Sequence, residues 1–316
     1  MARKIATRDA YGDALVRLGE RNADIVVLDA DLAKSTKTIK FKERFPERFF
    51  DMGIAEADMM GTAVGLAASG KIAFASTFAI FATGRAWEQI RNSICYTNLN
   101  VKIAASHAGI AVGPDGSSHQ SIEDIALMRV IPNMKVIVPA DGVETAKAVT
   151  ALVETSGPAY LRLGRSAVPA IYDEGFEFRI GRASVLREGS DVSIIATGTM
   201  VHVALSAAEA LAGDGINARV LNMSTIKPID AGAITAAAVE TGAIVTAEEH
   251  NVIGGLGSAV AEIVCETSPA PVVRVGIRDC FGRSGEADEL MAVYGLTRES
   301  IVDAAREVLS RKAVTK

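Results

Sequence analysis

Short, uninterrupted apolar runs alternate along this chain with segments of helical periodicity, and this alternation limits the folds open to the chain more than any other feature. In the first half, apolar runs occupy residues 25–28, 72–76, 101–105, 136–138 and 159–163. Helical spacing of apolar residues occupies residues 7–18, 54–68, 84–96 and 143–153. Strands without polar alternation are buried on both faces, which is typical of parallel sheets covered by helices. The sequence therefore predicts an α/β fold.

The alternation stops at residues 169–179, PAIYDEGFEFR, where proline, glycine and charged residues replace it. It then resumes, with apolar runs at residues 192–196, 218–222, 243–246 and 272–275 and helical patterns at 201–211 and 256–265. A chain of 316 residues is also longer than most single domains. We therefore predict one domain at residues 1–172, a linker and crossover at 173–187, and a smaller domain at 188–316. Each domain is expected to be a mostly parallel sheet covered by helices.

Composition and charge exclude several classes of protein. The formal net charge of −5 comes from dispersed acidic residues, and no run of Lys or Arg indicates a nucleic-acid partner. The three cysteines lie far apart without CxxC spacing, which argues against a disulfide framework and against a zinc site. The apolar stretch at 59–83 is interrupted by Lys71, and the N-terminus carries charges where a secretory signal needs an apolar core. We expect a cytoplasmic protein without a membrane span.

The segment at residues 51–61, DMGIAEADMMG, places Glu56 near the start of an apolar helix. An acid in the first turn of a helix is often there because the helix dipole favours it. A buried acid with a raised pKa can instead exchange a proton with a ring nitrogen of a ligand. The spacing alone leaves both interpretations open.

Two further segments concentrate groups that can contact a ligand. Residues 106–120, SHAGIAVGPDGSSHQ, carry His107, Asp115 and His119, which include two of the four histidines of the chain. A single loop histidine is usually only solvated, but this joint spacing favours a site. Residues 77–81, TFAIF, place Phe78 and Phe81 directly after a predicted strand, where they belong either to the core or to a ring-binding surface.

Together these segments resemble motifs of the transketolase family. GIAEADMMG is similar to the family's GIREHAMG and GIAEQNMVG, TFAIF to TFxxF, and residues 106–120 to THDSIGxGEDGPTHQ. The resemblance continues at residues 248–259, EEHNVIGGLGSA, which are similar to EEHxxxGGLGSA, so it covers nearly the whole chain. It implies a pyrimidine-binding domain followed by the family's C-terminal domain, which supports the dimer. His250 of the second domain is then expected to be structural.

The resemblance implies thiamine diphosphate as cofactor. Glu56 falls on the family's glutamate that contacts N1′ of the aminopyrimidine and thereby promotes deprotonation of thiazolium C2. Phe81 is the expected stacking residue, with Phe78 beside it, and Asp31 falls on an aspartate near the cofactor. Transketolases commonly carry a tyrosine where this chain has Gly84, and this departure is expected to loosen the pyrimidine pocket.

The resemblance also implies residues that bind the substrate. His107, Asp115 and His119 correspond to groups that hydrogen-bond sugar hydroxyls and move protons, with His107 and His119 in catalytic roles. The segments ATRDA, DADLAKS and GPAYLRLGR are similar to the family's ASRKA, SADLAPS and GPxxLxxSR. These segments supply the expected phosphate-binding residues, which are Arg8, Ser35 and Arg165.

One part of the family's active site has no counterpart in the sequence. The GDG-to-Asn motif that grips Mg²⁺ and the diphosphate is missing, because the GDG at residues 213–215 follows a helix and lacks the Asn. No metal ligand is therefore expected in this chain. The resemblance implies an N-terminal companion subunit that supplies the Mg²⁺ and diphosphate ligands. Two copies of each subunit, with homodimerisation through this chain, are the expected α2β2 assembly.

The implied activity is that of a transketolase, which moves a two-carbon glycolaldehyde unit from a ketose phosphate to an aldose phosphate in the pentose phosphate pathway. Three alternatives remain, namely the β subunit of a 2-oxoacid dehydrogenase, an enzyme similar to deoxyxylulose phosphate synthase, and a non-catalytic homologue. The expected phosphate-binding residues favour the transketolase, because a 2-oxoacid has no sugar phosphate to bind.

Overall fold

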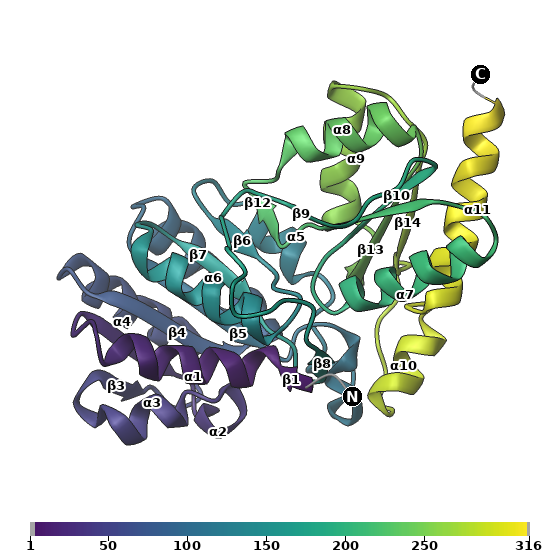
Figure 1. Cartoon of the computed structure of the whole chain (residues 1–316). Coiled ribbons are helices and arrows are strands. Elements are labelled where there is room, and N and C mark those ends of the chain that lie inside the picture. The colour runs from purple at the N-terminus through teal and green to yellow at the C-terminus, as the bar shows by residue number, and fades with distance from the viewer. Residues whose placement is uncertain (1–3, 315–316) are drawn as a thin grey trace.

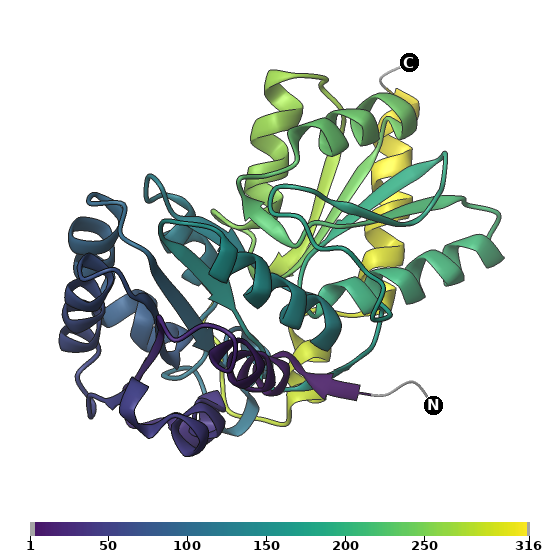
Figure 2. The same cartoon turned by 60° about the vertical axis from the view of Figure 1, so that its left-hand side comes forward.

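Two sheets, one from each half of the chain, form the framework of the computed structural model, which describes residues 4–314. They lie beside each other with helices on both faces (Figures 1 and 2). The first sheet has seven strands in the order β12-β6-β7-β5-β4-β2-β3, and the second has five in the order β14-β13-β10-β11-β9. All their neighbouring strands run parallel except at the β12 and β9 edges. The predicted α/β fold with two mostly parallel sheets is confirmed.

The first sheet is buried on both faces because its strands send alternate apolar side chains to opposite layers. Val26 and Leu28 belong to a core under α4 and α5, whereas Ile25 and Val27 belong to a core under α1 and α6. The strands are β2 (Ile25–Asp29), β3 (Phe49–Asp51), β4 (Ile72–Phe78), β5 (Val101–Ser106), β6 (Lys135–Ile137) and β7 (Ala159–Arg162). The helices are α1 (Thr7–Gly19), α2 (Ala33–Thr36), α3 (Ile39–Arg44), α4 (Glu56–Ala68), α5 (Asp124–Arg129) and α6 (Gly142–Glu154).

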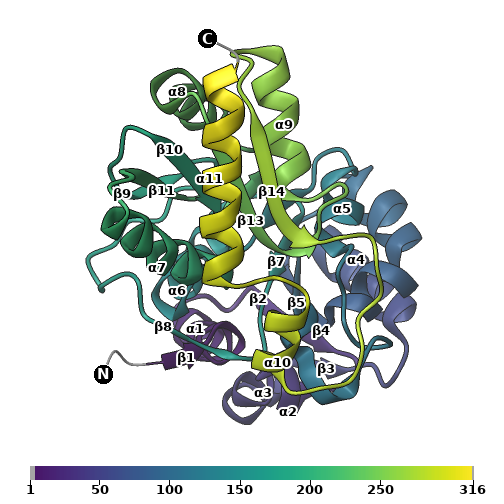
Figure 3. The same cartoon turned by 90° about the vertical axis from the view of Figure 1, so that its right-hand side faces the viewer.

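The second sheet is covered in the same way. Figure 3 shows α11 running along one face of this sheet, where it packs with α7, while α8 and α9 cover the other face. The strands are β9 (Ser184–Arg187), β10 (Val192–Ala196), β11 (Ala218–Asn222), β13 (Ile244–Asn251) and β14 (Val272–Ile277). The helices are α7 (Met200–Gly213), α8 (Ala231–Thr241), α9 (Leu256–Glu266), α10 (Ala287–Val293) and α11 (Arg298–Val314). Across residues 4–314, no helix combines the length and the apolar character that a membrane crossing requires.

Three short antiparallel pairs lie at the edges of the fold, and one of them ties the halves of the chain together. Strand β12 (Thr225–Lys227) comes from the second half but pairs with β6 at the edge of the first sheet. Strand β9 lies inside the predicted linker and pairs with β11 of the second sheet. Near the N-terminus, β1 (Lys4–Ala6) pairs with β8 (Ala167–Pro169). The division at residues 172 and 187 stays a prediction, and the segment interpreted as linker contributes a strand of its own.

A buried ion pair lies where the two halves meet. Arg162, at the end of β7, donates from Nε to Asp124 Oδ2 at 2.7 Å and from Nη2 to Asp124 Oδ1 at 3.1 Å. The Tyr160 hydroxyl donates to the same carboxylate at 2.6 Å, and Arg162 Nη2 donates to the backbone carbonyl of Glu249 at 3.0 Å. Burial alone would raise the pKa of Asp124, but the charge and hydrogen bonds of Arg162 outweigh it and hold that pKa below its ordinary value.

Replacing Arg162 by Met should lower the free energy of unfolding by about 3–5 kcal/mol, because the Asp124 carboxylate would stay buried without its charged partner. Arg298, which pairs with Glu299 on the surface, offers a matched control. Its replacement by Met should change stability by less than about 0.5 kcal/mol. Chemical denaturation measures both values. An equal effect of the two substitutions would contradict the stabilising role of the buried pair.

Candidate active site

The predicted site residues gather mainly at the carboxyl ends of the strands in the first sheet. His107 directly follows β5, Phe78 ends β4, and Arg165 lies three residues beyond β7. Ligands of open parallel sheets bind at this edge, because loops from neighbouring strands meet there. Arg8 reaches the same place from the first turn of α1, where its Nη1 lies 3.1 Å from His107 Nε2.

The environment of His107 fixes the protonation state of its ring. Burial, followed by the charges of Arg8 and Arg165, lowers the pKa of His107 to about 3, so the ring is neutral at physiological pH. An arginine can only donate, so Nε2 accepts from Arg8 and the proton sits on Nδ1. That nitrogen donates to Ser106 Oγ at 2.9 Å. His107 therefore presents an acceptor nitrogen towards Arg8.

Two phenylalanine rings connect His107 to the other predicted histidine. The Phe78 ring stacks on the His107 ring with centroids 3.8 Å apart, and Phe81 stacks on Phe78 at 5.7 Å. The His119 and Phe81 rings meet edge to face, with centroids 5.3 Å apart. Phe78 is buried, whereas Phe81 is partly exposed. The structure thus brings together four of the predicted side chains, whose roles stay predictions.

Glu56 is the first residue of α4 and is only 5% exposed. Its Oε1 accepts a hydrogen bond of 2.9 Å from Arg85 Nη1, and the Arg85 guanidinium lies 4.0 Å from the centroid of the Phe81 ring. Arg85 was not predicted, although it directly follows Gly84, the position marked as a departure from the family. Arg85 therefore links the predicted acid to the predicted stacking residue.

The segment that carries Phe81 and Arg85 differs from the expected helix at 84–96. Helical turns begin earlier, at residue 79, and are interrupted at Ala86. Two wide π-helical stretches, Phe81–Arg85 and Gln89–Cys95, replace the regular helix. Such widened turns are frequent at functional sites, because they redirect side chains that a regular helix would space evenly. Here they direct Arg85 towards Glu56.

The predicted phosphate-binding residues form two groups. Arg165 Nη1 lies 3.6 Å from Asp115 Oδ2 and also donates to the Val112 carbonyl. Arg8 Nη1 donates to the backbone carbonyl of Ser35 at 2.9 Å, so it is this carbonyl that meets Arg8. Burial lowers the pKa of Arg8, and the charge of Arg165 adds to that effect while Asp9 opposes it. The two guanidinium groups are thus close enough to repel each other, and an anion between them would relieve that repulsion.

Buried polar atoms near these groups lack partners within the described part of the chain. Arg8 Nε and the Thr77 hydroxyl are both buried without a hydrogen bond. Unsatisfied buried donors are costly, and they are often satisfied by a bound ligand or by water. Both atoms belong to residues at the site edge, one in the first turn of α1 and the other in β4.

Asp31 and its neighbour Asp29 lie at the carboxyl end of β2. Asp31 is exposed in the left-handed backbone region at φ 61°, and its amide donates to Asp51 Oδ1 at 3.2 Å. The unpredicted Asp29 is buried, and burial raises its pKa to about 6 despite hydrogen bonds from Thr36 and Thr38. Asp29 thereby holds the turn that carries Ser35. The sequence offered a signal for it, because an acid ends this buried strand.

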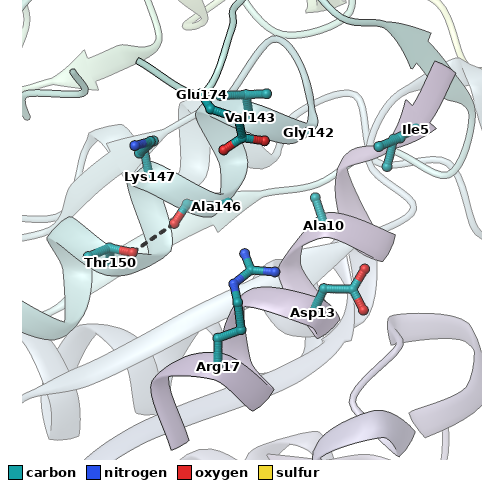
Figure 4. A pocket seen from close by; sticks show the side chains of 10 residues that line it. All are labelled: Ile5, Ala10, Asp13, Arg17, Gly142, Val143, Ala146, Lys147, Thr150 and Glu174. Atoms are coloured by element: carbon teal, nitrogen blue, oxygen red, sulfur yellow. Dashed lines mark hydrogen bonds between the residues drawn. The ribbon is translucent and has the colours of Figure 1, made fainter. Parts of the chain in front are cut away.

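A separate groove between α1 and α6 is drawn in Figure 4. Its charged residues are balanced in sign, with Arg17 and Lys147 facing the groove together with Asp13 and Glu174. None of the residues that line it belongs to the predicted site. Within residues 4–314, no cluster of three or more His, Cys, Asp or Glu side chains could hold a metal ion.

Comparisons with known proteins identify relatives of both halves. Residues 3–170 match the model of the transketolase pyrimidine-binding domain, and residues 181–301 match the transketolase C-terminal domain. A 6-deoxy-6-sulfo-D-fructose transketolase subunit from Clostridium sp. (strain MSTE9) is 48% identical over 96% of this chain and 95% of its own. A subunit of the apulose-4-phosphate transketolase from Phocaeicola vulgatus is 42% identical over 97% of this chain and 98% of its own.

A solved structure, described as a split gene transketolase in an inactive beta4 tetramer, shares 57% identity with this chain. It has a TM-score of 0.92 and covers 98% of this chain and 99% of its own.

The ring of His107 should stay neutral between about pH 5 and 8 in the free chain, because burial and two nearby cations oppose its protonation. Nitrogen-15 NMR of the histidine rings measures both the charge and the tautomer, and loss of the resonance in His107→Gln assigns it. Arg8→Ala should raise the pKa by removing one cation. Protonation of this ring within the stated pH range would contradict the interpretation.

Proposed function

Because the chain belongs to the transketolase family, we propose that it is the C-terminal subunit of a split transketolase dependent on thiamine diphosphate. The proposed reaction moves a two-carbon glycolaldehyde unit from a ketose phosphate to an aldose phosphate. Two relatives of nearly the same length are themselves described as transketolase subunits, which supports the split arrangement. The observation that carries the proposal is the buried Glu56 carboxylate, which Arg85 links to the partly exposed Phe81 ring.

The residues around Glu56 fit the pyrimidine end of the cofactor. A buried carboxylate can share a proton with a ring nitrogen, and the Phe81 ring offers a surface on which an aromatic ring stacks. When bound, thiamine diphosphate supplies the carbon nucleophile that cleaves the ketose. Glu56 would hold and return the proton at N1′, and Phe81 would orient the ring. Arg85 pairs with Glu56 and lies over the Phe81 ring, so it would have to move off the ring and share or release the carboxylate when the cofactor binds.

The cations near His107 support an anionic sugar as substrate. Arg8 has a free buried Nε, and Arg165 is close enough for its charge to act on both Arg8 and His107. We propose that these groups bind the phosphate, while His107, Asp115 and His119 contact sugar hydroxyls. The Phocaeicola relative is named for a phosphorylated sugar and the Clostridium relative for a sulfonated one. Both groups are anions that an arginine pair can bind. A 2-oxoacid has neither a phosphate for the arginine pair nor sugar hydroxyls for the three loop residues.

The companion subunit is the second part of the proposal. The family's Mg²⁺ and diphosphate ligands are expected from it, and the described residues of this chain contain no cluster able to hold a metal. The related beta4 tetramer is described as inactive. We propose that this chain becomes active in an α2β2 assembly, where the cofactor lies between unlike subunits.

Reconstitution with a companion that carries the GDG motif should give transketolase activity, and Glu56→Gln should lower kcat by at least about 100-fold because the proton-sharing group is lost. Asp58→Asn provides the matched control, since Asp58 is an exposed acid in the same first turn of α4. Turnover of xylulose 5-phosphate with ribose 5-phosphate measures the effect. Full activity of this chain alone would refute the split site, and unaltered turnover of Glu56→Gln would refute the role of Glu56.

Arg8→Ala should raise KM for a phosphorylated ketose by about 10- to 100-fold, the range expected when one charge-assisted hydrogen bond is lost. Arg17→Ala removes an exposed cation from the same helix and should leave KM unchanged. Parallel assays with a sulfonated ketose and with an uncharged one separate the possible substrates. Equal sensitivity of charged and uncharged sugars to Arg8→Ala would contradict anion binding by this residue.

A further inference from the structure

We propose that Glu249, in the second half of the chain, is a positioning residue for the loop that carries His107 and Asp115. Its effect on catalysis rests on the proposed function, whereas its effect on the loop does not. Glu249 lies on β13, is only 3% exposed, and is separated by more than 130 residues from the loop. None of the functional roles considered so far uses its side chain.

Both oxygens of the Glu249 carboxylate are engaged, and they connect two different parts of the fold. Oε1 accepts a hydrogen bond of 2.7 Å from the backbone amide of Ala111, inside the loop. Oε2 accepts one of 2.7 Å from the Thr199 hydroxyl, which precedes α7 in the second domain. Burial raises the pKa of Glu249, while the Arg162 charge and the Ala111 amide favour its ionised form. The Glu249 side chain thus connects the second domain to the loop through two hydrogen bonds.

The backbone of the loop is shaped to admit this carboxylate. Gly109 has φ +84°, and a Cβ at this position would lie 2.2 Å from Glu249 Oε1. Only glycine combines this left-handed conformation with so close an approach. His107 itself has φ +57°, so the backbone turns sharply on either side of Ala108. The loop therefore leaves β5 directly over the Glu249 carboxylate.

The second domain also covers the far end of the loop. Gln120 Nε2 donates to the Arg283 carbonyl at 3.0 Å, and α10 packs against the short 3₁₀ segment Ile110–Asp115. Figure 3 shows α10 reaching away from the second sheet towards the first domain. Arg165, which we propose to bind phosphate, donates to the Val112 carbonyl in the same segment. Displacement of the segment would therefore disturb both Asp115 and Arg165.

Hydrogen exchange of the free chain, followed by mass spectrometry, tests the positioning directly. Glu249→Ala should speed exchange in peptides spanning residues 108–116 by about 10- to 100-fold, because the Ala111 amide loses a buried charged acceptor. Glu249→Gln keeps an acceptor oxygen for this amide and should restore slow exchange. Unchanged exchange of the loop in Glu249→Ala would overturn the proposal. If Glu249→Ala does not fold, Thr199→Val removes the second anchor and is measured in its place.

Glu248 supplies a control for general damage to the second domain. It is the neighbouring buried carboxylate, and its oxygens accept from the amides of Leu256 and Gly257 at the start of α9. Glu248→Ala should speed exchange at the start of α9 and leave residues 108–116 unchanged. If both variants speed exchange of residues 108–116 equally, Glu249 stabilises the second domain in general. That result would overturn its assignment as a positioning residue for the loop.

The assembled enzyme then tests the link to the substrate. Glu249→Ala should lower kcat/KM for the donor sugar at least tenfold while the dissociation constant of thiamine diphosphate stays unchanged, and Glu249→Gln should recover most of the loss. If Glu249→Ala speeds exchange of the loop but leaves kcat/KM unaltered, the proposed effect of Glu249 on catalysis is wrong. Absence of transketolase activity in the unmodified assembly would count against the proposed function, and the exchange measurement would still decide whether Glu249 positions the loop.

Discussion

The arrangement of this molecule depends most on the hydrogen bonds and ion pair made by the Arg162 guanidinium. A fully buried cation is tolerated only when its donors are paired, and the pairing here reaches Asp124 at the start of α5 and the backbone of Glu249 on β13. Arg162 also donates to the Ser121 carbonyl, at the end of the loop that begins with His107. One side chain therefore fixes the positions of a strand, a helix, the second domain and the loop. The hydrogen bonds of Arg162 therefore help to set the geometry of the candidate site.

Charge explains how the site is prepared for a ligand before any ligand binds. The charge of Arg165 acts on Arg8, and both cations oppose protonation of the neutral His107 ring. An anion that enters there would stabilise both cations and reduce their effect on His107. Binding of such an anion and the proton affinity of that ring would in this way be coupled. The coupling would let His107 accept a proton more readily once the anion is in place.

The sequence predicted the elements that repeat a clear pattern and missed those that depend on partners. Uninterrupted apolar runs predicted the central strands, and β10 and β11 match their predicted ranges fully. Strands β9 and β12 have no comparable run, because each is a short antiparallel edge strand. The family resemblance, which the domain models confirm, identified Glu56, Phe81 and His107 as candidate site residues. Arg85 and Glu249 act through contacts across the fold, and no local spacing indicates such contacts.

Strand β12 has a consequence for how such a chain can be divided. It covers the outer edge of β6, so a first domain released at the linker would expose one unpaired edge of Lys135–Ile137, whose other edge pairs with β7. Exposed strand edges invite pairing with other chains. In a family whose members occur as separate subunits, a boundary between genes at this linker would thus favour aggregation of the upstream product. The pairing of β12 with β6 therefore favours keeping the two domains in one polypeptide.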